Sequence, residues 1–169
     1  QQQRVGIARS LAIEPDIWFL DEPFSALDPL IRREMQDEFL RLQAMLNKTI
    51  VFITHDFDEA LRLADRIAIM KDGAVEQCDT PDQIVLKPAT EYVRKFTEDI
   101  DKARVITAGV LAISGKKGTG EPVDAKSNVK QLANLLVHDK RKTIPVALDG
   151  EIIGAMERAD GLTVLLEAD

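Results

Sequence analysis

Two short apolar runs, at residues 17–20 and 50–53, constrain the fold of this chain more than any other feature. Short runs of this kind, bounded by turn-forming or polar residues, are typical of parallel strands that are buried on both faces. The segment between them opens with Asp28-Pro29, a helix N-cap followed by a first-turn proline, and then repeats apolar residues every three or four positions. A strand, a crossover helix and a second strand predict an α/β fold with parallel strands.

The alternation of helices and strands continues to about residue 100. We expect further helices at residues 3–13, 57–64 and 92–96, and a third strand at residues 67–70 that continues the parallel pattern. Asp72-Gly73 predicts a hairpin turn, after which the chain returns antiparallel. Asp56 and Glu59 have the spacing of a capping box, and Thr80 and Gln83 have it again around Pro81.

The character of the chain changes between residues 97 and 105. An apolar segment at 105–113, a helix that starts at Ser127 and a hairpin at Asp149-Gly150 predict a small β-α-β-β-α unit. The glycines at 115–120 are spaced G-x-x-G-x-G with no following Lys-Ser or Lys-Thr, so we interpret that segment as a flexible loop and not as a phosphate-binding loop. The sequence therefore predicts two domains, residues 1–100 and 105–169.

Composition excludes several classes of protein. The formal net charge is −7, which argues against a general nucleic-acid-binding protein. The single cysteine, Cys78, cannot form an internal disulfide, and two histidines with one cysteine are a poor basis for a zinc site. No apolar run is long enough to predict a transmembrane helix. The sequence does not begin with Met, so we interpret residue 1 as a cut point.

Acidic and imidazole side chains follow the first two strands. Asp21-Glu22 comes directly after the first apolar run, and His55 comes after the second. Because ligands of open α/β sheets bind at the carboxyl ends of strands, these side chains are candidates for one site. There an Asp can hold Mg²⁺, an adjacent Glu can polarise a water molecule, and a His can stabilise a phosphate. A charged loop and a structural histidine remain open as the simpler interpretation.

These residues carry a family resemblance. Residues 20–23 (Leu-Asp-Glu-Pro) and 25–28 (Ser-Ala-Leu-Asp) resemble the Walker B motif and D-loop of ATP-binding cassette (ABC) ATPases. Residues 53–56 (Ile-Thr-His-Asp) resemble their switch-histidine loop, and residues 1–9 resemble the segment that leaves the LSGGQ signature. Residues 24–38 are similar to ATPase subunits of glycine betaine/proline (quaternary amine) importers. The resemblance implies that residues 1–100 are the C-terminal part of a P-loop NTPase domain of the ABC type.

The resemblance also implies a role for each residue. Asp21 would support Mg²⁺, directly or through water, and Glu22 would be the general base for ATP hydrolysis. His55 would contact the γ-phosphate. Asp28 would act across the ATPase dimer, and Gln1 would belong to the signature that caps ATP bound by the partner subunit.

One departure from the family is large, because the phosphate-binding loop G-x-x-x-x-G-K-[ST] occurs nowhere in the 169 residues. We therefore expect the chain alone neither to bind ATP tightly nor to hydrolyse it, and we expect part of its core to be exposed. The parent protein would bind ATP and Mg²⁺ and would power an osmoprotectant importer. Its implied partners are a membrane permease, a second ATPase subunit and, indirectly, a substrate-binding protein, at the inner face of the plasma membrane.

Residues 105–169 resemble a single CBS motif, an α+β unit that works in pairs. The resemblance rests on Ile144-Pro145-Val146, Asp149-Gly150 and Arg158-Ala159-Asp160. It implies that Asp160 binds a ribose, although Glu157 stands where nucleotide-binding motifs have Ser or Thr. It also suggests contact with anionic lipid through a set of basic residues: Lys116, Lys117, Lys126, Lys130, Lys140, Arg141 and Lys142.

Two other functions stay open at this point. Residues 105–169 could be a regulatory binding module on an inactive ATPase remnant. The chain could also come from an ABC ATPase of DNA repair or translation, although residues 24–38, the CBS-like tail and the acidic charge count against that class and predict no nucleic-acid partner.

Overall fold

The computed structural model describes residues 2–46 and 48–167, with side chains described from Val5 onward. Its contacts divide the chain into two compact units, Gln1–Asp65 and Arg66–Asp169, which are described separately. This division lies inside the predicted first domain, and the domain boundary at residues 100–105 remains a prediction. In the part of the chain that is described, no helix is both long and apolar enough to span a membrane.

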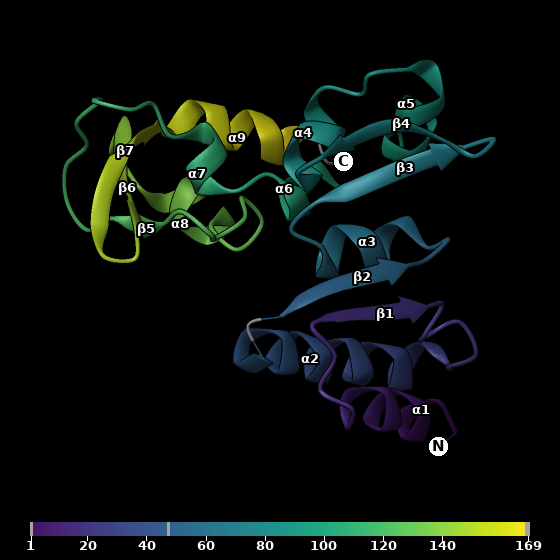
Figure 1. Ribbon diagram of the computed structural model, residues 1–169. Coiled ribbons are helices and arrows are strands. Elements are labelled where there is room, and N and C mark those ends of the chain that lie inside the picture. Colours follow the sequence, from purple (N-terminus) through teal and green to yellow (C-terminus); the bar gives the residue numbers. More distant parts are fainter. Residues whose placement is uncertain (1, 47, 168–169) are drawn as a thin grey trace. The chain divides into compact units, whose positions relative to one another are not determined.

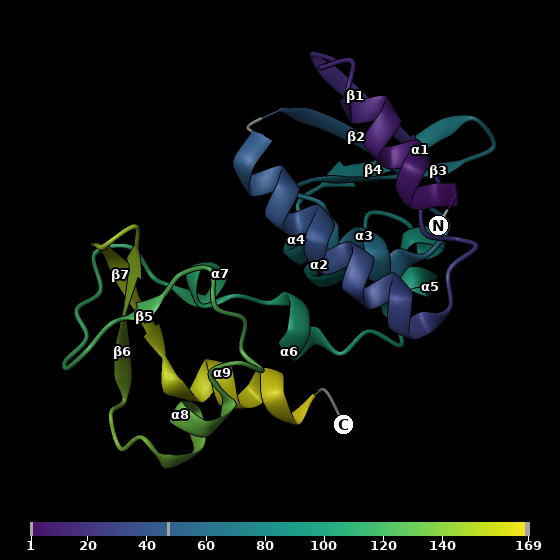
Figure 2. The same ribbon diagram turned by 90° about the horizontal axis from the view of Figure 1, so that it is seen from below.

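The first unit is a parallel strand pair with helices packed on one face (Figures 1 and 2). Its elements in chain order are α1 (Gln2–Leu11), β1 (Ile17–Asp21), α2 (Pro29–Leu46), β2 (Thr49–Ile53) and α3 (Phe57–Leu63). Strands β1 and β2 pair in parallel from Ile17↔Thr49 to Asp21↔Ile53. The predicted strand–helix–strand crossover is confirmed, and with it the α/β class with parallel strands.

Only one face of this strand pair is buried. Trp18 and Leu20 pack with Phe24, Phe39 and Leu63 in an apolar core. Phe39 lies near the centre, with its ring centroid 6.0 Å from that of Trp18 and 6.1 Å from that of Phe24. This core fixes α2 against the sheet, and so fixes the loops at the carboxyl ends of the two strands.

The opposite face of β1 and β2 is in contact with solvent. Ile17, Phe19, Val51 and Ile53 are 50%, 65%, 38% and 51% exposed. The prediction that these strands are buried on both faces is therefore wrong for this structure, in which no element among the described residues covers that side. The expected exposure of part of the core is observed.

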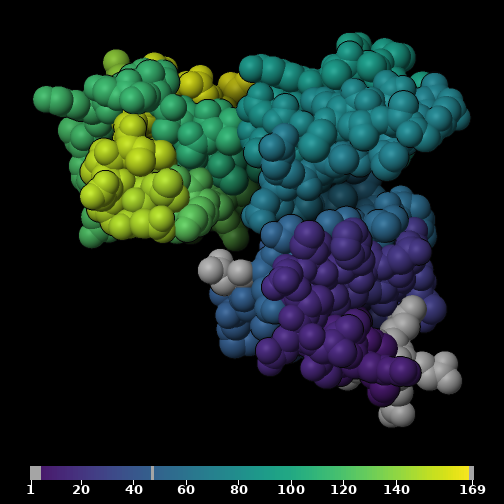
Figure 3. Space-filling view, in the orientation of Figure 1, coloured from purple at the N-terminus to yellow at the C-terminus, as the bar shows by residue number. Residues whose placement is uncertain are grey.

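The second unit contains two further sheets. Its elements are β3 (Ile67–Lys71), β4 (Ala74–Asp79), α4 (Pro81–Leu86), α5 (Glu91–Thr97), α6 (Lys102–Val105), α7 (Ala108–Leu111), β5 (Val123–Asp124), α8 (Ala133–His138), β6 (Thr143–Leu148), β7 (Glu151–Glu157) and α9 (Arg158–Leu166). In Figure 3 the hairpin of β6 and β7 reaches the surface of this unit, and Glu151, Ile152 and Ile153 in it are exposed.

The third predicted strand forms, but it does not join the parallel pair. Strand β3 pairs antiparallel with β4 in a separate two-stranded sheet. The turn between them has positive φ at Asp72 (50°) and Gly73 (79°), as the predicted hairpin requires. Because this two-residue turn places β4 beside β3 with little loss of chain entropy, β3 has a partner next to it in sequence.

The predicted β-α-β-β-α order is found, but its first strand is β5 (Val123–Asp124) and does not lie within residues 105–113. Strand β5 pairs in parallel with β6, and β6 pairs antiparallel with β7, while α8 and α9 complete the order. The prediction of a strand within residues 105–113 is wrong, because that segment contains the end of α6 and all of α7. The side chains of Ile106 and Ala108 are fully buried, so this segment packs into the core between short helices.

The loop at residues 115–120 is more constrained than its glycines suggest. A Cβ at Gly118 would lie 2.5 Å from the backbone nitrogen of Pro145, so the loop packs directly on β6. The guanidinium of Arg141 donates to the carbonyl oxygens of Thr119 (2.6 Å) and Glu121 (3.1 Å). The expected flexible loop is thus anchored to the sheet.

Candidate functional site

Glu22 lies at the turn where the chain leaves β1. Its backbone N–H donates to the carbonyl oxygen of Ile53 at 2.9 Å, so the parallel pairing continues one residue beyond the strand. Its φ is +46°, in the left-handed region that L-residues other than Asn, Asp and Gly seldom adopt. The Ser25 hydroxyl donates to the Glu22 carbonyl oxygen at 3.0 Å. The backbone around Glu22 is therefore sharply turned and bonded on both sides.

The structure brings Glu22 and His55 into direct contact. The Glu22 Oε1 atom lies 2.7 Å from Nδ1 of His55 and accepts a hydrogen bond from the His55 backbone N–H at 3.1 Å. The His55 side chain is 74% exposed and that of Glu22 is 34% exposed. The hydrogen bond that the Glu22 carboxylate accepts from the ring, reinforced by the negative charge of Glu22, raises the pKa of His55 above 6.5. The two predicted catalytic residues form one acid–imidazole pair.

Asp21 lies beside this pair but is not part of it. The residue is exposed at the end of β1, opposite Ile53 in the strand pairing. Asp21 and Glu22 help to line a shallow hollow of about 290 Å³ together with Gly6, Ile7 and Ser10 of α1. In the described residues no cluster of three or more His, Cys, Asp or Glu side chains is arranged for a metal ion. The assignment of Asp21 to Mg²⁺ stays a prediction.

The predicted dimer residues have different outcomes. Asp28 is exposed and caps α2, because its Oδ1 atom accepts hydrogen bonds from Leu30 N (3.2 Å) and Ile31 N (3.1 Å). This confirms its N-cap role and leaves its role across a dimer untested. Gln1 lies outside the described residues.

Asp160 lies in the second unit, whereas the other residues predicted for the site lie in the first. It is exposed in the first turn of α9. Glu157, three positions earlier, is the N-cap of α9 and forms an ion pair with Lys116. Glu157 stands where nucleotide-binding CBS motifs have Ser or Thr, and here its carboxylate is ion-paired. The observed contacts therefore do not favour ribose binding at Asp160.

Several of the basic residues assigned to lipid contact are paired within the second unit. Lys126 pairs with Asp149 (3.0 Å), Lys130 with Asp101 (2.5 Å) and Arg141 with Asp139 (2.5 Å), in addition to the Lys116 pair. Their charge is thus partly balanced locally, which weakens attraction to an anionic surface.

A polar network lies behind the His55 loop, and the sequence did not indicate it. Asp56 caps α3 by accepting from Glu59 N at 3.1 Å, but the Glu59 carboxylate does not return to Asp56 as a capping box would. Glu59 is 5% exposed and accepts instead from Gln36 Nε2 (3.1 Å) and Thr54 Oγ1 (2.9 Å). A second predicted cap also differs, since Gln83 donates to Asp82 and the Thr80 backbone N–H donates to Asp79.

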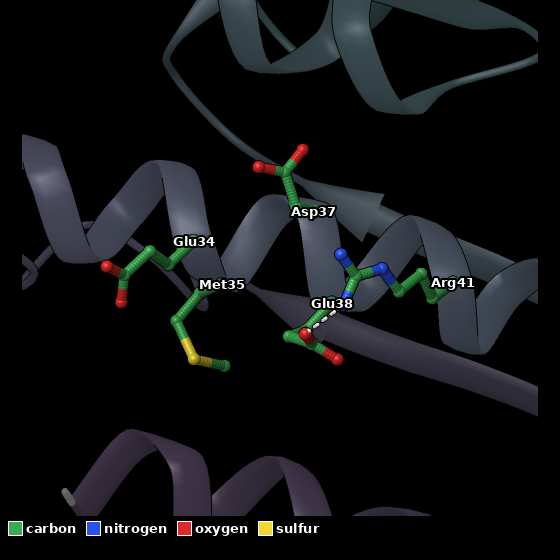
Figure 4. A pocket seen from close by; sticks show the side chains of 5 residues that line it. All are labelled: Glu34, Met35, Asp37, Glu38 and Arg41. Atoms are coloured by element: carbon green, nitrogen blue, oxygen red, sulfur yellow. Dashed lines mark hydrogen bonds and ion pairs between the residues drawn. The ribbon is translucent and has the colours of Figure 1, made fainter.

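A second surface hollow, of about 440 Å³, does not form a site. It is lined by Glu34, Met35, Asp37, Glu38 and Arg41, all of which lie along α2 (Figure 4). Glu38 and Arg41 pair with each other at 2.6 Å. Since one helix supplies every side chain, no groups converge on the hollow from opposite sides.

Comparison with known proteins finds relatives among the ATP-binding proteins of transport systems. No family model matches the sequence. The chain is 78% identical over 168 residues to the ATP-binding protein of a trimethylamine N-oxide transport system from Ruegeria pomeroyi, a match that covers 99% of this chain and 49% of that protein. It is 60% identical over 108 residues to a glycine betaine transport ATP-binding protein from Bacillus subtilis, covering 64% of this chain and 26% of that protein.

The chain spans about half the length of the first of these relatives. Among solved structures, a Clostridium perfringens protein that is part of an ABC transporter complex shows a TM-score of 0.46 and 34% identity, over 51% of this chain and 34% of that one.

Proposed function

Because the chain belongs to the family of ATP-binding subunits of ABC transport systems, we propose that it supplies the hydrolytic part of such a subunit. The complete subunit would hydrolyse ATP to power uptake of an osmoprotectant of the methylated or quaternary amine class. Glycine betaine, proline and trimethylamine N-oxide are the candidates, and the 78% identity to a trimethylamine N-oxide system favours the last. The observation that carries the proposal is the 2.7 Å contact between Glu22 and His55.

The geometry of the pair suits general base catalysis. One oxygen of the Glu22 carboxylate is bonded to His55, so the carboxylate is held in a fixed direction at the end of β1. The partly exposed Glu22 would accept the proton of an attacking water. His55, whose ring is mostly exposed, would orient that carboxylate through Nδ1 and present the rest of its ring to the phosphate.

The described residues fit one side of a Mg²⁺–ATP site. Asp21 offers an exposed carboxylate, the oxygen donor that Mg²⁺ prefers, at the carboxyl end of β1. ATP with Mg²⁺ would supply the phosphoryl group and the charge that neutralises its oxygens. The chain has no G-x-x-x-x-G-K-[ST] segment, so the phosphate-binding side would have to come from elsewhere in the full-length protein.

The proposal extends to partners that follow from a transport function. We infer a membrane permease, a second ATPase subunit contacted through Asp28 and Gln1, and an indirect link to a substrate-binding protein. The subunit would act at the inner face of the plasma membrane. Residues 1–100 would form the ATPase part, and residues 105–169 a single CBS-like motif that contacts anionic lipid or another copy of itself.

A regulatory role for residues 105–169 is the second candidate. Its support is the observed order β5, α8, β6, β7, α9, a mixed α and β arrangement of the general kind that the CBS resemblance implies. In that case residues 1–100 would serve as a scaffold. The relatives described above are transport proteins, which counts against an ABC ATPase of DNA repair or translation.

The test is ATP hydrolysis by a chimera in which residues 1–169 replace the matching half of the Ruegeria pomeroyi protein. The chimera should hydrolyse ATP, and Glu22→Gln should reduce kcat by about 10²- to 10⁴-fold, the usual contribution of a general base. Glu38→Gln is the matched control, because Glu38 is an exposed carboxylate on α2 that pairs only with Arg41 in the described contacts. Equal activity in Glu22→Gln and the control would contradict the proposal.

A further inference from the structure

We propose that Arg32 is a positioning residue that holds Glu22 and His55 in register by bonding to both loops that carry them. These are the β1–α2 loop (residues 22–28) and the β2–α3 loop (residues 54–56). The inference rests on the proposed function, since it concerns the geometry of the same acid–imidazole pair. It adds Arg32, which belongs to α2 and not to the loops that carry Glu22 and His55.

The bonds of Arg32 reach each loop separately. Arg32 is in the first turns of α2, and its Nη2 atom donates to the carbonyl oxygen of Leu27 at 3.3 Å. Its Nη1 atom donates to Oδ2 of Asp56 at 3.4 Å. Leu27 belongs to the loop that begins with Glu22, and Asp56 directly follows His55. One guanidinium therefore spans the gap between the two loops, as its planar set of donors allows.

Partial burial and two nearby carboxylates hold the Arg32 guanidinium in position. The Arg32 side chain is 30% exposed, but its Nε atom is buried and has no hydrogen-bond partner in the described part of the chain. Nε lies 3.9 Å from Oε1 of the buried Glu59, within ion-pair distance. Arg32 thus faces two carboxylates, those of Asp56 and Glu59, which would otherwise lie close together without a balancing charge.

Arg32 joins the two loops through several weak contacts. Its bonds of 3.3 and 3.4 Å are at the long end of the usual range, and its buried Nε has no hydrogen-bond partner among the described residues. Its Asp56 acceptor, by contrast, is itself fixed, because the other carboxylate oxygen caps α3. We infer that Arg32 transmits the position of one loop to the other.

The direction of the His55 ring depends on how the two loops are held relative to each other. The ring is 74% exposed, and its contact with Glu22 joins groups that lie 33 positions apart in the chain. A small shift between the loops would break a 2.7 Å contact, and a displacement of about 1 Å in a catalytic group can cost about 100-fold in rate.

The first experiment measures the tautomer of the His55 imidazole in the 169-residue chain. Nitrogen-15 NMR at a pH where the imidazole is neutral should show the Nδ1-protonated tautomer, held by Glu22. Arg32→Gln should lose that signature and give mixed tautomers, while circular dichroism shows a folded chain. Arg32→Lys should give an intermediate population, because one ammonium group cannot reach both Asp56 and Leu27. Arg41→Gln, on the exposed side of α2, is the control and should match the wild type.

The second experiment measures ATP hydrolysis in the chimera. Arg32→Gln should lower kcat by about tenfold or more while changing KM for ATP less than about twofold, since it acts on the reacting pair and not on ATP binding. A folded Arg32→Gln chain with an unchanged His55 ring spectrum would overturn the inference, as would an Arg32→Lys chain that matches the wild type. If Glu22→Gln abolishes hydrolysis and Arg32→Gln does not, the Arg32 inference fails alone. If Glu22→Gln has no effect, the proposed function fails.

Discussion

At the scale of single residues, one carboxylate oxygen has two tasks. Oε1 of Glu22 accepts from the backbone N–H of His55 and also contacts its ring. The backbone bond is independent of pH near neutrality, whereas the ring contact changes when the imidazole gains or loses its proton. The site therefore combines a fixed bond with one that titrates.

The titration has a definite sign. The pKa of His55 is raised above 6.5 by Glu22, so the folded chain holds this proton more tightly than the unfolded chain does. The resulting stabilisation is fully present below about pH 6.5 and is lost as the pH rises through the raised pKa of His55. An NMR titration should show a midpoint above 6.5 that returns to the ordinary value in Glu22→Gln. A midpoint that is the same in both chains would show that Glu22 is not the cause.

The residues of this site were not equally predictable. Glu22 and His55 directly follow apolar runs, and strand order alone brings two such positions to one sheet edge. Arg32 and Gln36 lie on α2, where a polar residue is normally interpreted as part of a solvated face. Their contacts with Asp56 and Glu59 span more than 20 residues of sequence, and they depend on how α2 packs on the sheet.

At the scale of elements, most local signals were correct, whereas of the predicted non-local pairings the parallel β1–β2 pair formed and β3 did not join it. The Asp28 cap with Pro29, and the Asp72-Gly73 turn, formed as predicted because each depends on neighbours in sequence. The predicted place of β3 in the parallel sheet and the predicted strand within residues 105–113 were wrong, although the antiparallel β3–β4 hairpin formed as predicted. Apolar runs are compatible with either strand or helix, and tertiary packing decides between them.

Strand β7 illustrates such packing through a close contact. A Cβ at Gly154 would lie 2.4 Å from the carbonyl oxygen of Ile113, where the chain before the 115–120 loop pairs with β7. Gly154→Ala should therefore destabilise the chain by about 1–3 kcal/mol, the usual cost of overpacking. Gly6→Ala is the contrasting change, because Gly6 is within α1 and has no atom within 4 Å of the added Cβ.

Gly6→Ala should stabilise the chain by about 0.5–1 kcal/mol, the advantage of Ala over Gly inside a helix. Urea unfolding followed by circular dichroism measures both variants on the same scale. Destabilisation by Gly6→Ala, or none by Gly154→Ala, would contradict this account of the two positions.

At the scale of the whole molecule, the exposed side of the β1–β2 pair dominates the expected behaviour in solution. Ile17, Phe19, Val51 and Ile53 form an apolar sheet face with substantial exposure. Contiguous apolar surface of this kind promotes association. The 169-residue chain should therefore self-associate as its concentration rises.

The matched test replaces two neighbours on that face, since Phe19 and Val51 are paired across the strands. Phe19→Lys combined with Val51→Glu should shift the chain toward monomer in sedimentation equilibrium without lowering Tm, because both side chains are already exposed. Met45→Lys, at a side chain of α2 that is 72% exposed, is the control and should leave association unchanged. A wild-type chain that is monomeric at all concentrations would refute the prediction.

The left-handed backbone conformation at Glu22 places different demands on thermal stability and on catalysis. A φ of +46° favours glycine or asparagine over glutamate, at a cost of about 1–2 kcal/mol. A library randomised at position 22 and selected for survival at high temperature should therefore enrich Gly and Asn, whereas selection for growth on the transported osmolyte should recover Glu. The strained turn after β1 would then be the position at which the proposed chemistry limits the thermal stability of the chain.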